Sequence, residues 1–198
     1  TVNITDIDEI GNAPVITSSS IFNAAENQTA IGTVTATDAD GDDITFSISG
    51  SELAITSAGV LTFVSAPDYE TKSSYTATVT ASDTTNSTTE EITVNVTDVN
   101  EAPVFTSSTS YSVDENQSSA GQLTASDPEG NTLIFSLGSG TDDNNLNINS
   151  STGVLTFKQN PNYENADSYQ ITASVYDGTN LVSQNVTINI NNLNEAPS

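Results

Sequence analysis

Apolar and polar residues alternate with a period of two along several stretches of the chain. Residues 75–81 alternate Tyr, Ala, Val and Ala with threonine, and residues 92–97 and 169–175 follow the same rule. Such alternation predicts antiparallel strands with one face buried against a partner sheet. Turn signals such as Asp40-Gly41 and Asp177-Gly178 recur at roughly 8–12-residue intervals. The pattern predicts about seven short strands in each half of the chain and no helix longer than a turn.

The sequence contains one module twice. Glu-Asn occurs at 26–27 and 115–116, an offset of 89 residues, whereas Gly-Val-Leu-Thr-Phe occurs at 59–63 and 153–157, an offset of 94. The change places a five-residue insertion near 139–145, where the sequence is Ser-Gly-Thr-Asp-Asp-Asn-Asn. This polar composition predicts a surface loop.

A chain of 198 residues suits two domains of about 100 residues each. We expect an all-β protein of two tandem seven-stranded Greek-key β-sandwiches. Pro103 follows the last strand of the first copy without a flexible linker, so we expect the domains to stack end to end. The chain starts in mid-pattern, and we expect it to come from a longer array. The predicted parts are a linker at 1–13, a first repeat at 14–100, a second repeat at 101–194 and the start of another linker at 195–198.

Charge excludes several classes of partner. The chain has 26 acidic and 2 basic residues, for a net charge of −24. This sign excludes binding to nucleic-acid phosphates and disfavours docking on anionic membranes. No apolar run approaches the ~20 residues of a membrane span, so we expect no direct membrane insertion. A plain acidic surface is the simplest alternative, but many of the acids fall at equivalent positions of the two copies.

The residue types that are absent exclude further chemistry. The chain has no Cys and no His, which excludes thiolate zinc sites and catalysis by Ser-His or Cys-His pairs. Paired carboxylates are also found in glycosidases, but the chain has no Trp and no aromatic sugar platform in its sequence. We therefore expect that it is not an enzyme. Carboxylates at a joint with almost no Lys or Arg suggest a metal instead.

The acidic motifs recur in a fixed order and resemble a known family. Five of them in order, twice, are similar to cadherin repeats, in the form of the bacterial cadherin-like repeats of large surface adhesins. The resemblance covers nearly the whole chain. In the first copy the motifs are Glu26-Asn27, Asp38-Ala39-Asp40, Asp68-Tyr69-Glu70, Ala81-Ser82-Asp83 and Asp98-Val99-Asn100-Glu101.

The resemblance implies calcium between consecutive domains. It also implies a partial site before the first domain. For the central junction, the implied ligands are Glu26, Asp68, Glu70, Asp98, the main-chain carbonyl of Asn100, Glu101, Asp127, Glu129 and Asp177. For the N-terminal partial site, they are Asp6, Asp8, Asp38, Asp40 and Asp83.

Elementary electrostatics agrees with a metal at the central junction. Eight carboxylates cannot share a small volume without cations, and calcium takes 6–8 oxygen ligands, so the set would satisfy about three ions. The many flexible anionic ligands fit calcium better than magnesium, and softer metals lack Cys or His. At the C-terminal end Asn162 and Asn192 replace Asp68 and Asp98, which leaves Glu115, Glu164 and Glu195. We expect weak or no binding there.

These inferences predict an extracellular, cell-surface protein. Its function would be that of a calcium-rigidified tandem repeat of an adhesin that mediates or extends cell adhesion, with neighbouring repeats of the same chain as partners. The alternative is a calcium-dependent binding module for a polysaccharide or for another cadherin-like repeat. A local alternative for residues 38–43 is a hydrated hairpin turn. An EF-hand is excluded there because its twelfth position would be Ser49.

Overall fold

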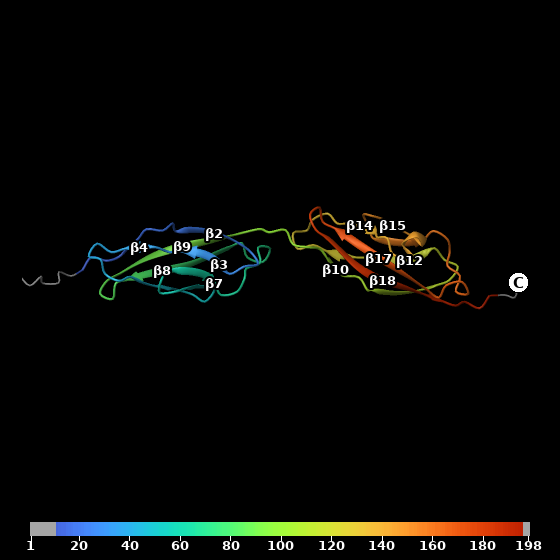
Figure 1. Ribbon diagram of the computed structural model, residues 1–198, viewed down its shortest axis with the longest axis horizontal. Helices are drawn as coiled ribbons and strands as arrows, with labels where there is room; N and C mark the ends of the chain where they lie inside the picture. The colour runs from blue at the N-terminus through green and yellow to red at the C-terminus, as the bar shows by residue number, and fades with distance from the viewer. Residues whose placement is uncertain (1–10, 196–198) are drawn as a thin grey trace, which may run out of the picture. The chain divides into compact units, whose positions relative to one another are not determined.

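The computed structural model describes residues 11–195, which form strands joined by turns and one short 3-10 helix (Figure 1). The chain divides into two compact units, of which the first ends at Val99 and the second begins at Asn100. Each unit is a β-sandwich. The predicted all-β class with two tandem sandwiches is therefore confirmed. Within residues 11–195, no helix has the length and apolar character needed to cross a membrane.

The first unit packs two sheets against each other. One sheet has the strand order β2-β9-β8-β5, the other has the order β3-β7-β6, and β1 pairs with β4. The pairing of β2 with β9 is parallel, and the remaining pairs are antiparallel. The strands are β1 Val15–Ile16, β2 Ile21–Ala25, β3 Ala30–Thr33, β4 Ala36–Thr37, β5 Thr45–Ile48, β6 Leu53–Ile55, β7 Val60–Phe63, β8 Ser74–Ser82 and β9 Ser87–Thr97.

The second unit repeats this topology. Its sheets have the orders β11-β18-β17-β14 and β12-β16-β15, and β10 pairs with β13. The strand pair β11 and β18 is again parallel. The strands are β10 Val104–Phe105, β11 Ser110–Asp114, β12 Ser119–Gln122, β13 Ala125–Ser126, β14 Ile134–Leu137, β15 Leu146–Ile148, β16 Val154–Phe157, β17 Ser168–Tyr176 and β18 Leu181–Asn191.

Nine strand segments in each unit make up seven strands of the sandwich. In the first unit, β3 and β4 are one strand interrupted only at Val34 and Thr35. The first strand also changes sheets, because β1 pairs with β4 whereas β2 pairs with β9. At this crossing the N–H groups of Thr17 and Ser18 both donate to the carbonyl of Thr35. Within the described residues the strand number thus agrees with the prediction.

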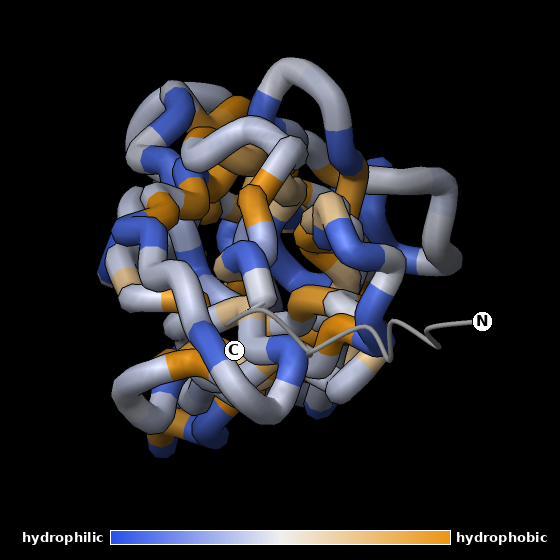
Figure 2. Tube along the Cα trace, turned by 90° about the vertical axis from the view of Figure 1, so that its left-hand side faces the viewer, coloured by the Kyte–Doolittle hydropathy of each residue, from blue (hydrophilic) through white to orange (hydrophobic). Residues whose placement is uncertain are grey.

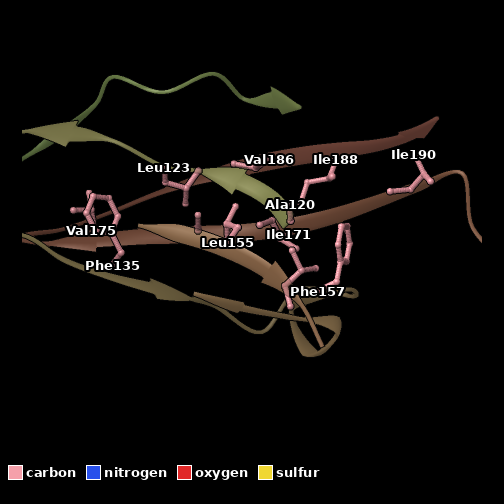
Figure 3. Close-up of a cluster of buried hydrophobic side chains, with 12 residues drawn as sticks. Ala120, Leu123, Phe135, Leu155, Phe157, Ile171, Val175, Val186, Ile188 and Ile190 are labelled. Atoms are coloured by element: carbon pink, nitrogen blue, oxygen red, sulfur yellow. The ribbon is translucent and has the colours of Figure 1, made fainter. Parts of the chain in front are cut away.

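The core of each unit comes from the alternation seen in the sequence. Along β8 and β9, Val79, Ala81, Ile92 and Val94 are buried while their threonine and asparagine neighbours stay partly exposed. Figure 2 shows the resulting mixture of hydrophobic and hydrophilic positions along the trace. In the second unit, side chains from both sheets meet in one cluster (Figure 3). This burial supplies the main favourable term for folding.

The repeated Gly-Val-Leu-Thr-Phe motif begins at a glycine for a steric reason. Gly59 and Gly153 have φ values of +87° and +68°, and the N–H groups of Val34 and Leu123 donate to their carbonyls at 2.8 and 2.9 Å. A Cβ atom at Gly153 would lie well inside contact distance of the Leu123 carbonyl oxygen. Only glycine allows the two strands to approach this closely.

We expect Gly153→Ala to destabilise the second unit by about 3 kcal/mol or more, because positive φ and a backbone clash act together. Thermal unfolding followed by circular dichroism measures this loss. Gly130→Ala is the matched control, since Gly130 also has a positive φ of +73° but a Cβ atom added there would meet nothing within 4 Å. An equal loss for both variants would contradict the role of the clash.

The insertion in the second unit differs from the expectation in two ways. Leu53 pairs with Phe63 and Leu146 with Phe157, so only four of the five extra residues lie before β15. The fifth lies in the turn between β15 and β16. The insertion also forms a 3-10 helix, Asp143–Asn145, and Asp143 is buried at 5% exposure. A polar run in the sequence therefore contains a carboxylate that is part of the interior.

Candidate metal centres

Glu26 joins three segments at one end of the first unit. It follows β2 and its side chain is only 2% exposed. Its Oε2 accepts the N–H of Tyr69 at 2.8 Å, and its Oε1 accepts that of Val99 at 2.8 Å. These charge-assisted bonds fasten the loop before β8 and the segment after β9 to the end of β2.

Glu26 is also the buried member of an acidic group. Glu26, Glu70 and Asp98 each offer a carboxylate oxygen within 4.8 Å of the other two. Glu70 and Asp98 are exposed. The predicted ligand Asp68 is outside this group, and its Oδ1 accepts the N–H of Thr71 at 3.0 Å. The first unit thus brings together three of its four predicted acids for the central site.

Asp177 accepts several hydrogen bonds at the end of the second unit where the chain enters at Asn100. It follows β17 and is 8% exposed. Its Oδ1 accepts the N–H groups of Thr179 and Asn180 at 2.6 and 2.5 Å. Its Oδ2 accepts the side-chain amides of Asn100 and Asn180 at 3.0 and 3.2 Å. The charged form is therefore solvated by four protein donors.

These donors control the titration of Asp177. Burial alone raises the pKa of Asp177, but the N–H groups of Asn180 and Thr179 and the amides of Asn100 and Asn180 lower it to about 2. The equivalent residue Asp83 also has a lowered pKa, chiefly through the N–H of Asn86. A folded-state pKa below the unfolded value of about 3.9 stabilises the fold above that pH, and this contribution is lost as the pH falls toward 2.

We expect the stability difference between the natural chain and Asp177→Asn to be present at neutral pH and to disappear between about pH 4 and pH 2. Urea unfolding in the presence of chelator measures this difference without interference from metal. The side-chain carboxyl resonance of Asp177, followed by NMR, should titrate near pH 2. A midpoint near pH 4 would contradict the hydrogen-bonding account.

The other predicted ligands of the second unit lie around the same end. Asp127 Oδ1 accepts the N–H of Asn131 at 2.9 Å, and Glu129 Oε2 accepts that of Glu101 at 3.2 Å. Asn100 is predicted to act through its main-chain carbonyl. The structure gives its side chain a separate role, because Oδ1 accepts the amide of Asn131 at 2.9 Å while Nδ2 donates to Asp177.

The first unit has the corresponding arrangement around Gly11 and Asn12, where the loops after β4 and β8 meet the segment that leads into β1. Asp38 Oδ1 accepts the N–H groups of Asp40 and Gly41 at 2.8 and 3.1 Å. Asp40 in turn accepts the N–H of Asn12 at 2.6 Å. Asp83 Oδ1 accepts the N–H groups of residues 85 and 86 at 2.7 and 2.5 Å. The predicted ligands Asp6 and Asp8 lie outside the described residues.

Four buried carboxylate oxygens have no hydrogen-bond donor among the described residues. They are Asp38 Oδ2 and Asp83 Oδ2 in the first unit, and Asp127 Oδ2 and Glu129 Oε1 in the second. Asp38 and Asp127 are repeat equivalents. Burying an anionic oxygen without a partner is costly. A bound cation would remove this cost, so the residues present fit a metal.

The C-terminal end of the second unit carries its own acidic group. Glu115, Glu164 and Glu195 offer oxygens within 4.8 Å of one another. Glu115 is 1% exposed and accepts the N–H groups of Tyr163 and Leu193 at 2.9 and 2.8 Å, as Glu26 does in the first unit. Weak or no binding at this end stays a prediction.

The prediction from sequence did not include the asparagines that orient the acids. Asn180 Nδ2 bonds both to Asp177 and to the carbonyl of Glu101, at 3.2 Å each. Asn86 Nδ2 donates to the carbonyl of Gly11 at 2.6 Å. The signal is present as Asp-x-x-Asn, which occurs at 83–86 and again at 177–180. Such supporting partners fix the geometry of ligands around a metal.

Residues 100–190 match the bacterial Ig domain family. The chain is also 36% identical over 133 residues to chitinase A from Pseudoalteromonas piscicida. That match covers 65% of this chain but only 16% of the chitinase, so the chain spans a small part of this curated relative.

Solved cadherin structures share the fold. EC1-2 of human protocadherin-24 has a TM-score of 0.62 and 22% identity, over 93% of this chain and 100% of that one. EC1-4 of Drosophila N-cadherin has a TM-score of 0.65 and 19% identity, over 92% of this chain and 50% of that one. The two units are therefore tandem cadherin-like β-sandwiches, and the second also matches the bacterial Ig domain.

Proposed function

We propose that the two units are calcium-binding tandem repeats that act as an extracellular spacer in a larger surface or secreted protein. The carrying observation is the set of buried carboxylate oxygens without donors, at Asp38, Asp83, Asp127 and Glu129. A cation takes the place of the missing donors. The all-oxygen ligand set, with no Cys or His in the chain, favours calcium over softer metals.

Calcium titration into chelator-treated protein by calorimetry tests the proposal. We expect uptake of two or more ions, reduced in a variant that combines Asp98→Ala with Asp127→Ala. Glu90→Ala with Glu91→Ala is the control of equal charge, because these acids lie on β9 and belong to none of the acidic groups of the described residues. Absence of uptake at millimolar calcium would reduce the acids to surface charge.

The spacer role requires that calcium stiffen the chain. The resemblance to cadherin repeats predicts that acids of both units bind the same ions, so that calcium stiffens the chain. Solution scattering tests this by comparing the length of the particle with calcium and with chelator. An unchanged length and stiffness would overturn the spacer role and leave calcium binding itself intact.

An extracellular location is consistent with the expected affinity. Calcium modules outside cells bind at about 10⁻⁴–10⁻³ M, which only millimolar calcium can fill. The bacterial Ig match and the chitinase relative support a secreted or surface protein, and adhesion in an adhesin is the setting that the sequence resemblance favours. We propose that these units have no catalytic role of their own, and hydrolytic activity in the purified chain would contradict this.

A second candidate function is binding of a polysaccharide. One observation favours it over binding to another cadherin-like repeat. The 36% identical relative is named as a chitinase, an enzyme that acts on a polysaccharide. A glycan array with calcium and with chelator would test this candidate, and its failure would leave the calcium proposal unaffected.

A further inference from the structure

The two repeats differ around the tyrosine in the second position of β8 and of β17. In the first unit Tyr75 is covered by a cation, because Lys72 Nζ lies 4.2 Å from the centre of its ring. Lys72 is held there by Glu52, whose carboxylate oxygens lie 2.6 and 2.7 Å from Nζ. This face of the first unit is closed by an ion pair packed on an aromatic ring.

The second unit lacks both members of that ion pair. The equivalent of Lys72 is Ala166. The equivalent of Glu52 is Asn145, since Val64 N donates to the Glu52 carbonyl just as Lys158 N donates to that of Asn145. A cavity of about 330 Å³ borders the ring of Tyr169 at this place. The volume lies at the small end of ligand pockets.

The lining of this cavity consists largely of amide side chains. Six of its nine lining residues are Asn or Gln, and none is Asp or Glu, although the chain has 26 acidic residues. Its apolar part is formed by Tyr169 and Phe157, whose ring centres are 5.1 Å apart. Within the described residues, the side-chain amides of Asn144, Gln159 and Asn165 make no hydrogen bond. They are available as donors and acceptors for a ligand.

The wall formed by the insertion is fixed in place. Asp143 Oδ1 accepts the N–H of Thr172 at 2.9 Å, and Asp142 Oδ2 accepts that of Gln170 at 2.8 Å. On the other side, Lys158 Nζ donates to the carbonyl of Asn144 at 2.8 Å. The buried carboxylate of the insertion thus ties the loop to β17. A pre-formed wall lowers the entropy cost of binding.

We propose that this cavity binds a neutral saccharide segment, with Tyr169 packing against a sugar ring and the amides of Asn144, Gln159 and Asn165 bonding to its hydroxyls. A neutral polyol fits a pocket of amides because each amide both donates and accepts hydrogen bonds. An aromatic ring offers an apolar face with a polar tip. The chain's net charge of −24 disfavours an acidic sugar.

The inference rests on the second candidate function, for which it supplies a location and a ligand class. It is independent of calcium, because no carboxylate lines the cavity. The insertion that forms its wall is confined to the second unit. The first unit therefore serves as an internal control in the same chain.

The test is an NMR titration of the full chain with neutral hexasaccharides of β-1,4-linked glucose, xylose, mannose or N-acetylglucosamine, in calcium and in chelator. We expect at least one of them to shift the amide signals of residues 144–169. We also expect Gln159→Ala with Asn165→Ala to weaken that binding about tenfold or more, since each removes an unpartnered amide. Ser65→Ala with Thr71→Ala, at the equivalent positions of the first unit, should change nothing.

Saccharide binding that the double variant leaves unchanged, or that shifts signals of the first unit instead, overturns the pocket and keeps the second candidate function. No binding of any of the four sugars at millimolar concentration overturns both. Tyr169→Leu separates ring packing from folding, because it keeps an apolar side chain on Phe157 and should still abolish binding.

Discussion

Replacing Glu115 with alanine is expected to lower the unfolding free energy of the second unit by about 3 kcal/mol, even in chelator. The side chain is 1% exposed and accepts the N–H groups of Tyr163 and Leu193. The variant would remove the carboxylate that both N–H groups donate to, and it would leave a void where the buried side chain was. A loss of this size is a large share of the ~5–15 kcal/mol that stabilise a domain, and thermal unfolding should show it as a fall of more than about 10 °C.

The exposed acids of the same groups are the matched controls. Glu164→Ala removes a carboxylate within 4.8 Å of Glu115 without removing any bond to the backbone, and it should change the stability in chelator by less than about 0.5 kcal/mol. In the first unit, Glu26→Ala is the equivalent variant of the buried acid, and Asp98→Ala is its exposed control. If Glu115→Ala and Glu164→Ala were equally stable in chelator, the backbone bonds of Glu115 would contribute nothing.

A loss of stability in chelator would separate the two roles of Glu115, which are to hold the backbone and to bind calcium. Glu26 and Glu115 hold the segments after the last strand and before β8 or β17 to the rest of the sandwich. They do this through hydrogen bonds that need no metal. The glutamate at the start of each copy is therefore explained in part by folding. The recurrence of an acid at a repeat position does not by itself indicate a ligand.

The sequence predicts the sandwich well because its signals are local. Alternation at residues 75–81 and 169–175 directly gives β8 and β17, and the glycines at 59 and 153 mark where β7 and β16 start. The interruption at Val34 and Thr35 is not predictable in this way. It arises because β3 pairs with β7 whereas β4 pairs with β1. No local sequence pattern contains the identity of these partner strands.

The parts of the site that escape prediction depend on distant backbone. The sequence places Asp143 in a polar surface loop, yet it bonds to Thr172, which lies 29 residues away in the chain. The cavity beside Tyr169 could be predicted only by aligning the two repeats. Ala166 stands where the first repeat has Lys72, and this difference is visible only once the strand register is known. The acid positions themselves are predictable, since they recur with the repeat.

Neutralising Asp127 and Glu129 should change stability in opposite directions with and without calcium. Each has a buried oxygen without a donor. In chelator, Asp127→Asn with Glu129→Gln removes two partly buried charges, so the second unit should be as stable as the natural chain or more stable. In millimolar calcium the natural chain gains about 1–3 kcal/mol by mass action, and the variant should gain much less.

The natural chain and the double variant should exchange their order of stability as the calcium concentration rises. Urea unfolding at a series of calcium concentrations measures it, and the natural chain should become the more stable of the two only as calcium rises. Asp142→Asn with Asp167→Asn is the control of equal charge, since both lie in the second unit but outside the acidic groups. This control should shift little with calcium. If the natural chain were the more stable at every calcium concentration, Asp127 and Glu129 would be ordinary structural carboxylates, and the observation that carries the calcium proposal would be lost.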